Sequence, residues 1–280
     1  MFAKIPPSAK LIDFEALKNN FLLPRRFNSH KGEYGHAAVI GGDLGMAGAV
    51  RMTSEACARV GAGLTSAYTH PEHVSIITTA RPEIMAHAIP DPNNLATLLT
   101  RATVLALGPG LGRRQWGEVC FSNVIQLDKP KVIDADAIGF LANSSLKSDA
   151  WILTPHPKEA ATLLNTTTKV IQADRFTAIR QLQKQYGGTI VLKGAGTLIY
   201  DGKSPIYICN AGNPGMASGG MGDILTGIIA GLVAQQIPLF QAACLGVYLH
   251  ATAGDLCAKA KGERGMLALD VLPYIRSLIN

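Results

Sequence analysis

The chain has 280 residues, of which 48% are hydrophobic and 16% charged, a composition typical of a globular protein with a sizeable core. The formal net charge is +6, but no basic run exceeds two residues and aromatic residues make up only 6%. A nucleic-acid interface usually needs a basic stripe with stacking aromatics. Nucleic acid is therefore not an expected partner.

The cysteine pattern and the short apolar segments indicate the cellular compartment in which the protein is expected. The five cysteines are widely spaced and form no CxxC pair, which favours buried free thiols in a reducing compartment. The first residues lack the uninterrupted apolar core of a signal peptide. The most apolar helical stretch, residues 224–234, is shorter than the roughly 20 residues that cross a bilayer. We expect a soluble cytoplasmic protein with no membrane partner.

Short apolar runs alternate with helical periodicity after an N-terminal arm, residues 1–30, that holds a short helical segment at 13–20. Strands are expected at residues 36–40, 64–69, 103–107, 131–133, 151–153 and 189–192, and further helices at 47–60, 115–126 and 172–186. A hairpin is expected through Gly194 and residues 201–202, and the last third is mainly helical. This alternation predicts one α/β domain over residues 1–280, with a mostly parallel central sheet and helices on both faces.

Glycine turns and polar residues follow nearly every predicted strand. They occupy residues 41–43, 108–112, 134–136, 154–156 and 193–194. Because ligands of open α/β sheets bind at the carboxyl ends of the strands, these turns predict one ligand site at that edge.

The strongest local signal is the glycine-rich run at residues 210–223, which leads into an apolar helix. Backbone without side chains can approach a ligand closely, and the first N–H groups of a helix are free donors, so the run predicts an anion hole for phosphate. Asp223 lies at the positive end of this helix, which favours its ionised form. Beside a phosphate it would take a proton from an attacking hydroxyl group. The alternative is that Asp223 only caps the helix, but a cap does not need so many glycines.

Other polar residues carry two interpretations each. No GxxxxGK[ST] run is present, which excludes a P-loop NTPase. The run that begins at Lys193 either meets a nucleotide or forms an ordinary hairpin turn. His156, held between two prolines, either orients a substrate or is a hydrogen-bonded loop residue. Asp134 and Asp136 either hold Mg²⁺, directly or through water, or cap the next helix. His70 and His73 have no further ligand at metal spacing and are expected at the surface.

Several of these runs, in this order, resemble a known family. They lie at residues 31–36, 41–49, 61–64, 108–112, 134–137, 154–157, 193–197 and 212–223. They resemble the ADP-dependent (S)-NAD(P)H-hydrate dehydratases, the carbohydrate-kinase-like half of the NAD(P)H-hydrate repair system. The resemblance runs from about Lys31 to the C-terminus, and Gly-Met-Ala-x-Gly-Gly-x-Gly-Asp and Thr-Pro-His-Pro are its most specific parts. It implies a ribokinase-like α/β sandwich.

The resemblance also implies a reaction and its residues. ADP would phosphorylate the C6 hydroxyl of the S epimer of hydrated NADH or NADPH, after which phosphate would leave, giving NAD(P)H and AMP. Asp223 would be the catalytic residue. The hydrated dinucleotide would contact Ala49, Gly112, His156 and Asp223, and the adenine nucleotide would contact Lys193, Gly194, Ala195, Gly196, Thr197 and Gly222. The choice of ADP over ATP, the use of Mg²⁺ and a homo-oligomer such as a tetramer rest on the resemblance alone.

The chain departs from the family pattern at Lys158, where relatives usually have glycine. Many bacterial relatives also carry an N-terminal epimerase half, so we expect a separate epimerase, or a spontaneous reaction, to convert the R epimer. One alternative is an ATP-dependent small-molecule kinase of the same superfamily, such as a vitamin-precursor hydroxymethyl or hydroxyethyl kinase. Another is a nucleotide-binding regulatory protein without turnover, which the presence of Asp223 argues against.

Overall fold

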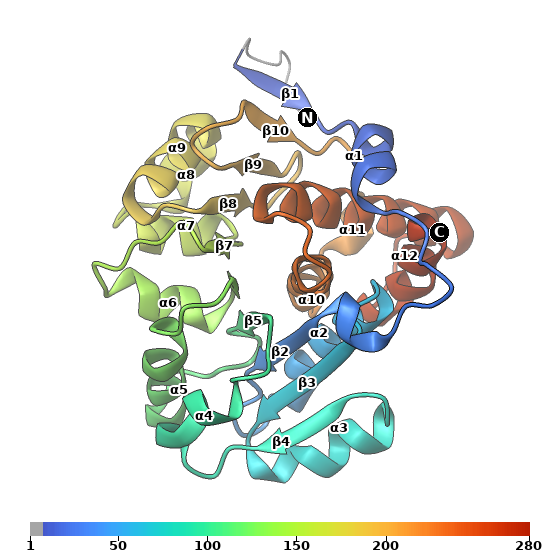
Figure 1. Ribbon diagram of the computed structural model, residues 1–280. Coiled ribbons are helices and arrows are strands. Elements are labelled where there is room, and N and C mark those ends of the chain that lie inside the picture. The colour runs from blue at the N-terminus through green and yellow to red at the C-terminus, as the bar shows by residue number, and fades with distance from the viewer. Residues whose placement is uncertain (1–7) are drawn as a thin grey trace.

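The computed structural model describes residues 8–280 as a ten-stranded sheet covered by helices (Figure 1). The strand order is β1-β10-β9-β8-β7-β6-β5-β2-β3-β4. Neighbouring strands of the described chain pair in parallel except where β9 meets β8 and β10. The strands are β1 (Ala9–Leu11), β2 (His36–Ile40), β3 (Leu64–Thr69), β4 (Met85–Ala88), β5 (Val104–Leu107), β6 (Lys131–Ile133), β7 (Trp151–Leu153), β8 (Thr189–Leu192), β9 (Leu198–Tyr200) and β10 (Ile206–Ile208). The predicted parallel sheet is confirmed.

Helices cover both faces of this sheet and form two apolar cores, one on each side. One face carries α4 to α9, and the other carries α1 to α3 and α10 to α12 (Figure 1). The helices are α1 (Phe14–Phe21), α2 (Ala47–Arg59), α3 (Val74–Ala80), α4 (Leu95–Leu98), α5 (Gln115–Ile125), α6 (Asp136–Ala142), α7 (Pro157–Leu163), α8 (Thr168–Ala173), α9 (Arg175–Tyr186), α10 (Met221–Ala234), α11 (Leu239–Lys261) and α12 (Leu272–Ile279). Within residues 8–280, none of these helices is both long and apolar enough to cross a membrane.

The central strands agree closely with the sequence because both of their faces are buried. Strands β5, β6, β7 and β8 are buried at every position, as near-continuous apolar runs predict. The edge strands β1 and β4 were not expected, since they are three or four residues long and mostly exposed. The helix expected at residues 172–186 is two helices, because the Asp174 side chain accepts the N–H of Thr177 and begins α9 there.

The small-residue stripe on α10 has a packing role. A Cβ at Gly227 would lie 2.2 Å from the carbonyl oxygen of Thr53, and one at Gly231 would lie 2.3 Å from Cγ1 of Val60. Helices α2 and α10 therefore approach each other backbone to backbone. Helix α10 also packs on β2, β5 and β6, strands whose ends carry the predicted ligand site.

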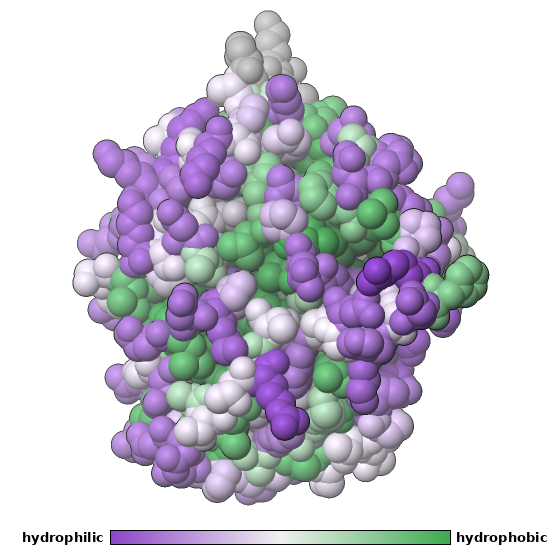
Figure 2. All heavy atoms as spheres, in the orientation of Figure 1, coloured by the Kyte–Doolittle hydropathy of each residue, from purple (hydrophilic) through white to green (hydrophobic). Residues whose placement is uncertain are grey.

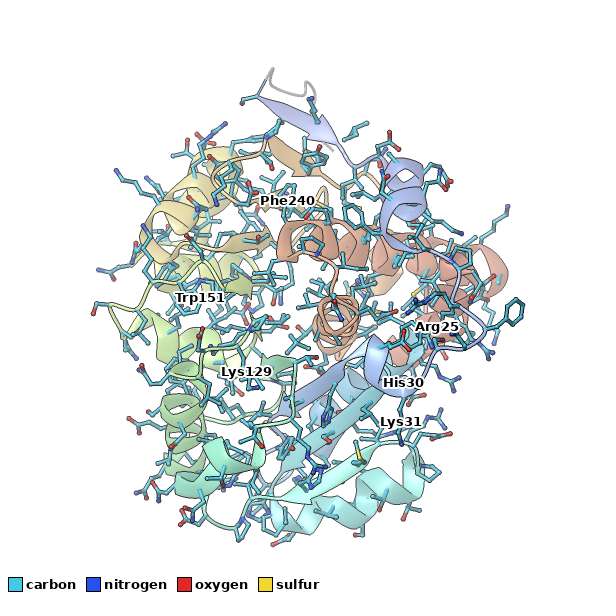
Figure 3. The ribbon with its side chains drawn as sticks, viewed as in Figure 1. Arg25, His30, Lys31, Lys129, Trp151 and Phe240 are labelled. Carbon is cyan, nitrogen blue, oxygen red and sulfur yellow. The ribbon has the colours of Figure 1, made fainter. Side chains whose placement is uncertain are left out.

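The N-terminal segment is joined to the sheet. Residues 1–7 of the predicted arm lie outside the described residues, whereas β1 pairs with β10 and α1 is capped by Asp13. Arg25 lies near His30 and Lys31 on this segment (Figure 3), with its guanidinium carbon 3.8 Å from the centre of the Tyr34 ring. The same guanidinium donates to the carbonyl oxygen of Gly61, so the segment is tied to the end of α2.

The loops that follow the central strands are bonded to each other at one edge. Gly42 donates its N–H to the Pro109 carbonyl at 3.0 Å, and Lys193 donates its N–H to the Pro155 carbonyl at 2.9 Å. Asp134 follows β6 and lies between these pairs in strand order. The predicted gathering of polar turns at the carboxyl ends is confirmed. The five cysteines are buried free thiols, as expected.

Candidate nucleotide and catalytic site

A cavity of about 650 Å³ lies between the β8–β9 loop, the loop before α10 and helix α11. Its walls are largely apolar, and Figure 2 shows apolar side chains gathered at the centre of the molecular face, over α10 and α11. All six residues that the resemblance assigns to the adenine nucleotide line this cavity: Lys193, Gly194, Ala195, Gly196, Thr197 and Gly222. The structure therefore brings together two runs that are far apart in sequence.

The loop of residues 193–197 is both a hairpin turn and a cavity wall. Strands β8 and β9 pair antiparallel, so the hairpin interpretation is confirmed. The buried guanidinium of Arg175 is hydrogen-bonded to the backbone of this loop. Nη1 donates to the carbonyls of Ala195 and Gly196 at 2.8 and 3.1 Å, and Nη2 donates to the carbonyl of Leu192 at 2.9 Å. A rigid guanidinium fork bonded to several carbonyls keeps the loop in one shape.

The glycine-rich loop before α10 is held in a similar way from α11. Asp255 accepts the N–H of Gly212 at 2.8 Å and the side-chain amide of Asn213 at 2.9 Å. The N-cap of α10 is Gly220, which has a left-handed conformation with φ of 89° and provides no capping side chain. The first turn of α10 therefore has no capping side chain, and its Gly222 lines the cavity, as an anion hole requires.

Asp223 is the third residue of α10 and does not cap it, so the cap interpretation is wrong. The expectation that the helix start favours its ionised form is also wrong. Burial raises the pKa of Asp223 to about 7, and the negative charges of Asp134 and Asp136 add to this effect, while Lys193 opposes it only in part. A carboxyl group whose pKa lies near the working pH suits proton transfer.

Lys193 is fixed by a buried network, and its charge also interacts with that of Asp223. Its Nζ lies 2.7 Å from Oδ1 of Asp134, and Oδ2 of Asp134 accepts the hydroxyl of Thr226 at 2.7 Å. Burial acts against the ionised form of Asp134, but Lys193 and these hydrogen bonds hold the pKa below its usual range. Lys193 is therefore a charged group at the boundary between the cavity and Asp223. The proposed cap role of Asp134 is wrong, because its side chain bonds to Lys193 and Thr226.

His156 is the N-cap of α7, and its ring orientation is set by two backbone donors. Nδ1 accepts the N–H groups of Lys158 and Glu159, both at 3.1 Å, so the proton of the neutral ring lies on Nε2. Burial and the charge of Lys193 lower the pKa of His156, which keeps the ring neutral. Oε2 of Glu159 accepts the His156 N–H at 2.7 Å, and Oε1 lies 3.4 Å from Nε2.

Glu159 joins His156 to Lys193, since Oε2 lies 3.8 Å from Lys193 Nζ. Burial raises the pKa of Glu159 to about 7, although the charge of Lys193 opposes the shift. The structure thus places His156, Glu159, Lys193, Asp134 and Asp223 in one electrostatic cluster. Thr-Pro-His-Pro sits at this cluster and not on the wall of the cavity.

Gly112 and Ala49 lie at the neighbouring strand ends. Gly112 has φ of 71°, and a Cβ there would lie 2.4 Å from Oδ2 of the buried Asp43, so glycine is required. Its N–H donates to Asp136 at 3.0 Å, and Arg114 Nε donates to Asp43 at 2.9 Å. Ala49, in the first turn of α2, packs beside the loop of residues 108–112. A Cβ at Gly110 in that loop would lie 3.0 Å from the Cβ of Ala49.

The residues present do not form a ready-made metal site. Among the side chains of residues 8–280, no group of three or more His, Cys, Asp or Glu is placed to hold a metal ion. Both oxygens of Asp134 are engaged by Lys193 and Thr226, and Asp136 accepts the N–H of Gly112. Asp136 is the first residue of α6 and its side chain does not cap that helix. Direct ligation of Mg²⁺ by this pair therefore does not fit.

The expectation that His70 and His73 are surface residues is wrong for His73. Its exposed fraction is only 4%, because the loop after β2 folds over it. Nδ1 lies 3.0 Å from the carbonyl oxygen of Gly42, and Nε2 accepts the N–H of Gly45 at 3.4 Å. His73 is a structural residue that supports the turn after β2.

Sequence reasoning missed three residues that shape the site. Glu159 follows His156 by three positions, the spacing of a capping box, so its contact with the histidine could have been found. Arg175 and Asp255 act on backbone atoms of loops that are remote in sequence. No local pattern marks such contacts, because they depend on the packing of α9 and α11.

Solved structures with this fold include two that match nearly the whole chain. A ribokinase-like superfamily protein from Enterococcus faecalis has a TM-score of 0.90 and 29% identity, covering 100% of this chain and 98% of its own. An ADP/ATP-dependent NAD(P)H-hydrate dehydratase from Bacillus subtilis, co-crystallised with ATP and Mg²⁺, has a TM-score of 0.85 and 27% identity, covering 95% and 97%. A hydroxyethylthiazole kinase from Pyrococcus horikoshii, at 12% identity and a TM-score of 0.64, shares only the fold. The ribokinase-like prediction is confirmed.

Relatives by sequence include proteins of two lengths. A bifunctional NAD(P)H-hydrate repair enzyme from Coxiella burnetii is 54% identical over 260 residues, 92% of this chain and 53% of its own. The chain thus spans about half the length of the bifunctional relatives that it matches. An ADP-dependent (S)-NAD(P)H-hydrate dehydratase from Neisseria meningitidis is 39% identical over 265 residues, 91% of this chain and 88% of its own. A family model described as NAD(P)H-hydrate dehydratase matches residues 37–277, and the chain belongs to this family.

Proposed function

We propose that the chain is an ADP-dependent dehydratase of the S epimer of hydrated NADH and NADPH, with Asp223 as its catalytic base. The observation that carries the proposal is the position of Asp223. It follows Gly222, which lines the 650 Å³ cavity, and its pKa is raised to about 7. A proton acceptor of this pKa beside a nucleotide cavity supports transfer of phosphate to a hydroxyl group.

The proposed reaction has two steps. Ionised Asp223 takes the proton of the C6 hydroxyl group, whose oxygen attacks the terminal phosphorus of ADP, and AMP leaves. The C6–O bond then breaks with departure of phosphate, and loss of a proton from the neighbouring ring carbon restores the double bond of NAD(P)H. Lys193, charged and held by Asp134, is placed to neutralise negative charge that develops at the phosphates.

The hydrated dinucleotide would lie on the other side of Lys193, toward the ends of β2, β5 and β7. Ala49, Gly112 and His156 are our proposed contacts on that side, together with Asp223. Neutral His156 presents an Nε2–H group of fixed orientation, which suits a polar group of the substrate. Lys158, in the first turn of α7, adds a positive charge near this part of the site.

Further parts of the proposal follow from the family. Mg²⁺ would enter with the nucleotide phosphates and water and not through a protein ligand cluster, in line with its preference for phosphate and water oxygens. Residues 1–280 would act as one domain in a cytoplasmic homo-oligomer such as a tetramer. A separate epimerase activity would supply the S epimer from the R epimer.

The direct test is to incubate the protein with the S hydrate and ADP, with ATP, or without nucleotide, and to follow the absorbance of reduced nicotinamide. We expect regeneration of NAD(P)H with ADP, together with stoichiometric AMP and phosphate. A stable phosphorylated product with ATP would instead support the small-molecule kinase. Absence of turnover with tight nucleotide binding would support a regulatory protein.

Gly222→Val tests the nucleotide side of the site. A Cβ at Gly222 would lie 3.5 Å from Lys193 Nζ and 3.6 Å from Asp134 Oδ2, so a methyl group fits and the fold should survive. The two extra carbons of valine would enter the cavity where phosphate binds. We expect severe loss of ADP affinity, measured by calorimetry, in a protein that melts normally, and a smaller loss in Gly222→Ala. Normal ADP affinity in a folded Gly222→Val variant would remove the loop from the anion hole.

A further inference from the structure

His250 lies on α11, and its side chain reaches the cavity wall beside Val247 and Ala251. It is not part of any glycine-rich run or of the cluster around Asp223. Only 8% of its surface is exposed, so the imidazole is largely buried where the residue lines the cavity. This position gives a polar group to a wall that is otherwise mostly apolar.

Nε2 of His250 is buried and has no hydrogen-bond partner in the described part of the chain. Nearly all buried polar atoms in folded proteins have a partner, because a buried polar atom without one destabilises the fold. Burial and the positive charge of Lys193 lower the pKa of His250 to about 4. The ring is therefore neutral, with one nitrogen that donates and one that accepts.

Among the described residues, the cavity lining includes Lys193 and His250 but no Asp or Glu. Lys193 marks the phosphate end, since its Nζ lies 3.5 Å from the Cβ position of Gly222. His250 is close enough to Lys193 for that charge to act on its ring. Helix α11 packs against β8, the strand that Lys193 follows, so His250 lies toward the part of a bound nucleotide near the phosphates, where oxygens of sugar and phosphate lie.

We propose that His250 binds the nucleotide directly, through a hydrogen bond between Nε2 and an oxygen of its sugar–phosphate part. This inference rests on the proposed nucleotide function of the cavity. A sugar hydroxyl can donate to Nε2 or accept from it, and a phosphate oxygen can accept from it. Because Nε2 is buried in the nucleotide-free protein, the ring turns on binding so that this nitrogen reaches the cavity surface and gains the partner that the protein does not provide.

The test compares ADP binding by calorimetry in the wild type, His250→Phe and His250→Gln. Phenylalanine keeps an aromatic ring but cannot form the hydrogen bond, whereas the amide of glutamine reaches the position of Nε2. We expect His250→Phe to raise the Kd for ADP roughly tenfold, which equals about 1.4 kcal/mol, and His250→Gln to recover part of the loss. The Tm of nucleotide-free His250→Phe should equal or exceed that of the wild type, because a buried unpaired nitrogen is removed.

The control is His87→Phe, in which an exposed histidine is replaced on β4, at the far end of the sheet from β10. It should leave the Kd unchanged. Adenosine and AMP then locate the contact: a loss already present with adenosine assigns a sugar oxygen, and a loss that appears only with AMP and ADP assigns a phosphate oxygen.

An equal Kd for ADP in the wild type and a folded His250→Phe variant would overturn the inference while leaving the nucleotide cavity in place. The same loss with free adenine would also overturn it, because the contact would then be to the base. Failure of the wild type to bind ADP would overturn both proposals. If phenylalanine prevents folding, His250→Gln is compared with His250→Asn. The shorter amide of asparagine cannot reach the Nε2 position, so equal ADP affinities of these two variants would contradict the contact.

Discussion

Lys193 separates two regions of the site that are built on different principles. On the cavity side the walls are largely apolar, and the loops are held from behind by Arg175 and Asp255, which bond to backbone groups. On the other side, charged side chains crowd together, and Asp223 and Glu159 both have a pKa raised to about 7.

This difference suits two separate tasks, nucleotide binding on the cavity side and proton transfer on the other side. A region that binds a nucleotide gains from rigid loops and from walls that do not change charge with pH. A region that moves protons gains from carboxyl groups whose pKa lies near neutrality, which burial and mutual repulsion provide. Substitutions on the two sides should therefore affect different measured constants, and four predictions test this, from the largest expected effect to the smallest.

Asp223→Asn should have the largest effect. It keeps the size of the side chain but removes the proton acceptor, so kcat for dehydration of the hydrate should fall at least ~10²-fold. Affinity for ADP, measured by calorimetry, should be retained or should rise, because a negative charge near the phosphates is gone. Turnover within a few-fold of the wild type would transfer the catalytic role to Asp134 or Asp136.

Arg175→Met should act on the nucleotide side. It removes at least three hydrogen bonds to the carbonyls of the β8–β9 loop, so KM for ADP should rise at least tenfold and the free energy of unfolding should fall by about 3 kcal/mol. KM for the hydrate should change much less, and Arg175→Lys should recover only a part, because a lysine lacks the guanidinium fork.

The control for this prediction is Arg180→Met, on the exposed side of the same helix α9. It should leave both KM values unchanged. Equal increases of the two KM values in Arg175→Met would show that the arginine supports the whole site and does not position the nucleotide loop.

His156→Ala should act on the opposite side. Loss of a neutral hydrogen-bonding group should raise KM for the hydrate about fivefold and leave the Kd for ADP unchanged. His30→Ala is a matched control, because His30 caps a short helix with Glu33 in the same way that His156 does with Glu159. An effect confined to ADP binding would place His156 in the nucleotide region.

The two regions could not be predicted equally well from the sequence. The buried strands and the glycine runs carry strong local patterns, so the parallel sheet and the cavity-lining run that begins at Lys193 could be predicted. The protonation state of Asp223 could not, because its pKa depends on how deeply it is buried and on Asp134, which follows strand β6 and lies 89 positions away in the sequence. Position at a helix start favoured the opposite sign, and burial outweighs it.

The same limit applies to side chains that act across the fold. Arg175 begins a helix whose sequence shows no sign of a contact with the β8–β9 loop, and His250 lies within a long apolar helix where a histidine has many interpretations. The mistaken surface position of His73 has the same origin, since the loop that buries it comes from β2. Local patterns predict elements and backbone turns well, but partners of single polar side chains follow from tertiary packing.

The smallest predicted effect concerns stability and pH, and it tests the charge crowding directly. The pKa of Asp223 is about 7 in the folded protein, against an ordinary value of 3.8. A carboxyl group with a raised pKa contributes fully to stability below its unfolded pKa, and the contribution is lost as the pH rises through the folded pKa.

At pH 8 ionised Asp223 therefore destabilises the fold, and Asp223→Asn should relieve this. Because the Asp223 side chain is partly exposed and solvent screens its charge, we expect about 1 kcal/mol, or a Tm higher by roughly 2–4 °C. The difference should shrink toward pH 5, where both proteins carry an uncharged group. Calorimetric melting of the wild type and the variant at pH 5 and pH 8 measures it, and a Tm difference that does not depend on pH would show that Asp223 is not held near neutrality by its neighbours.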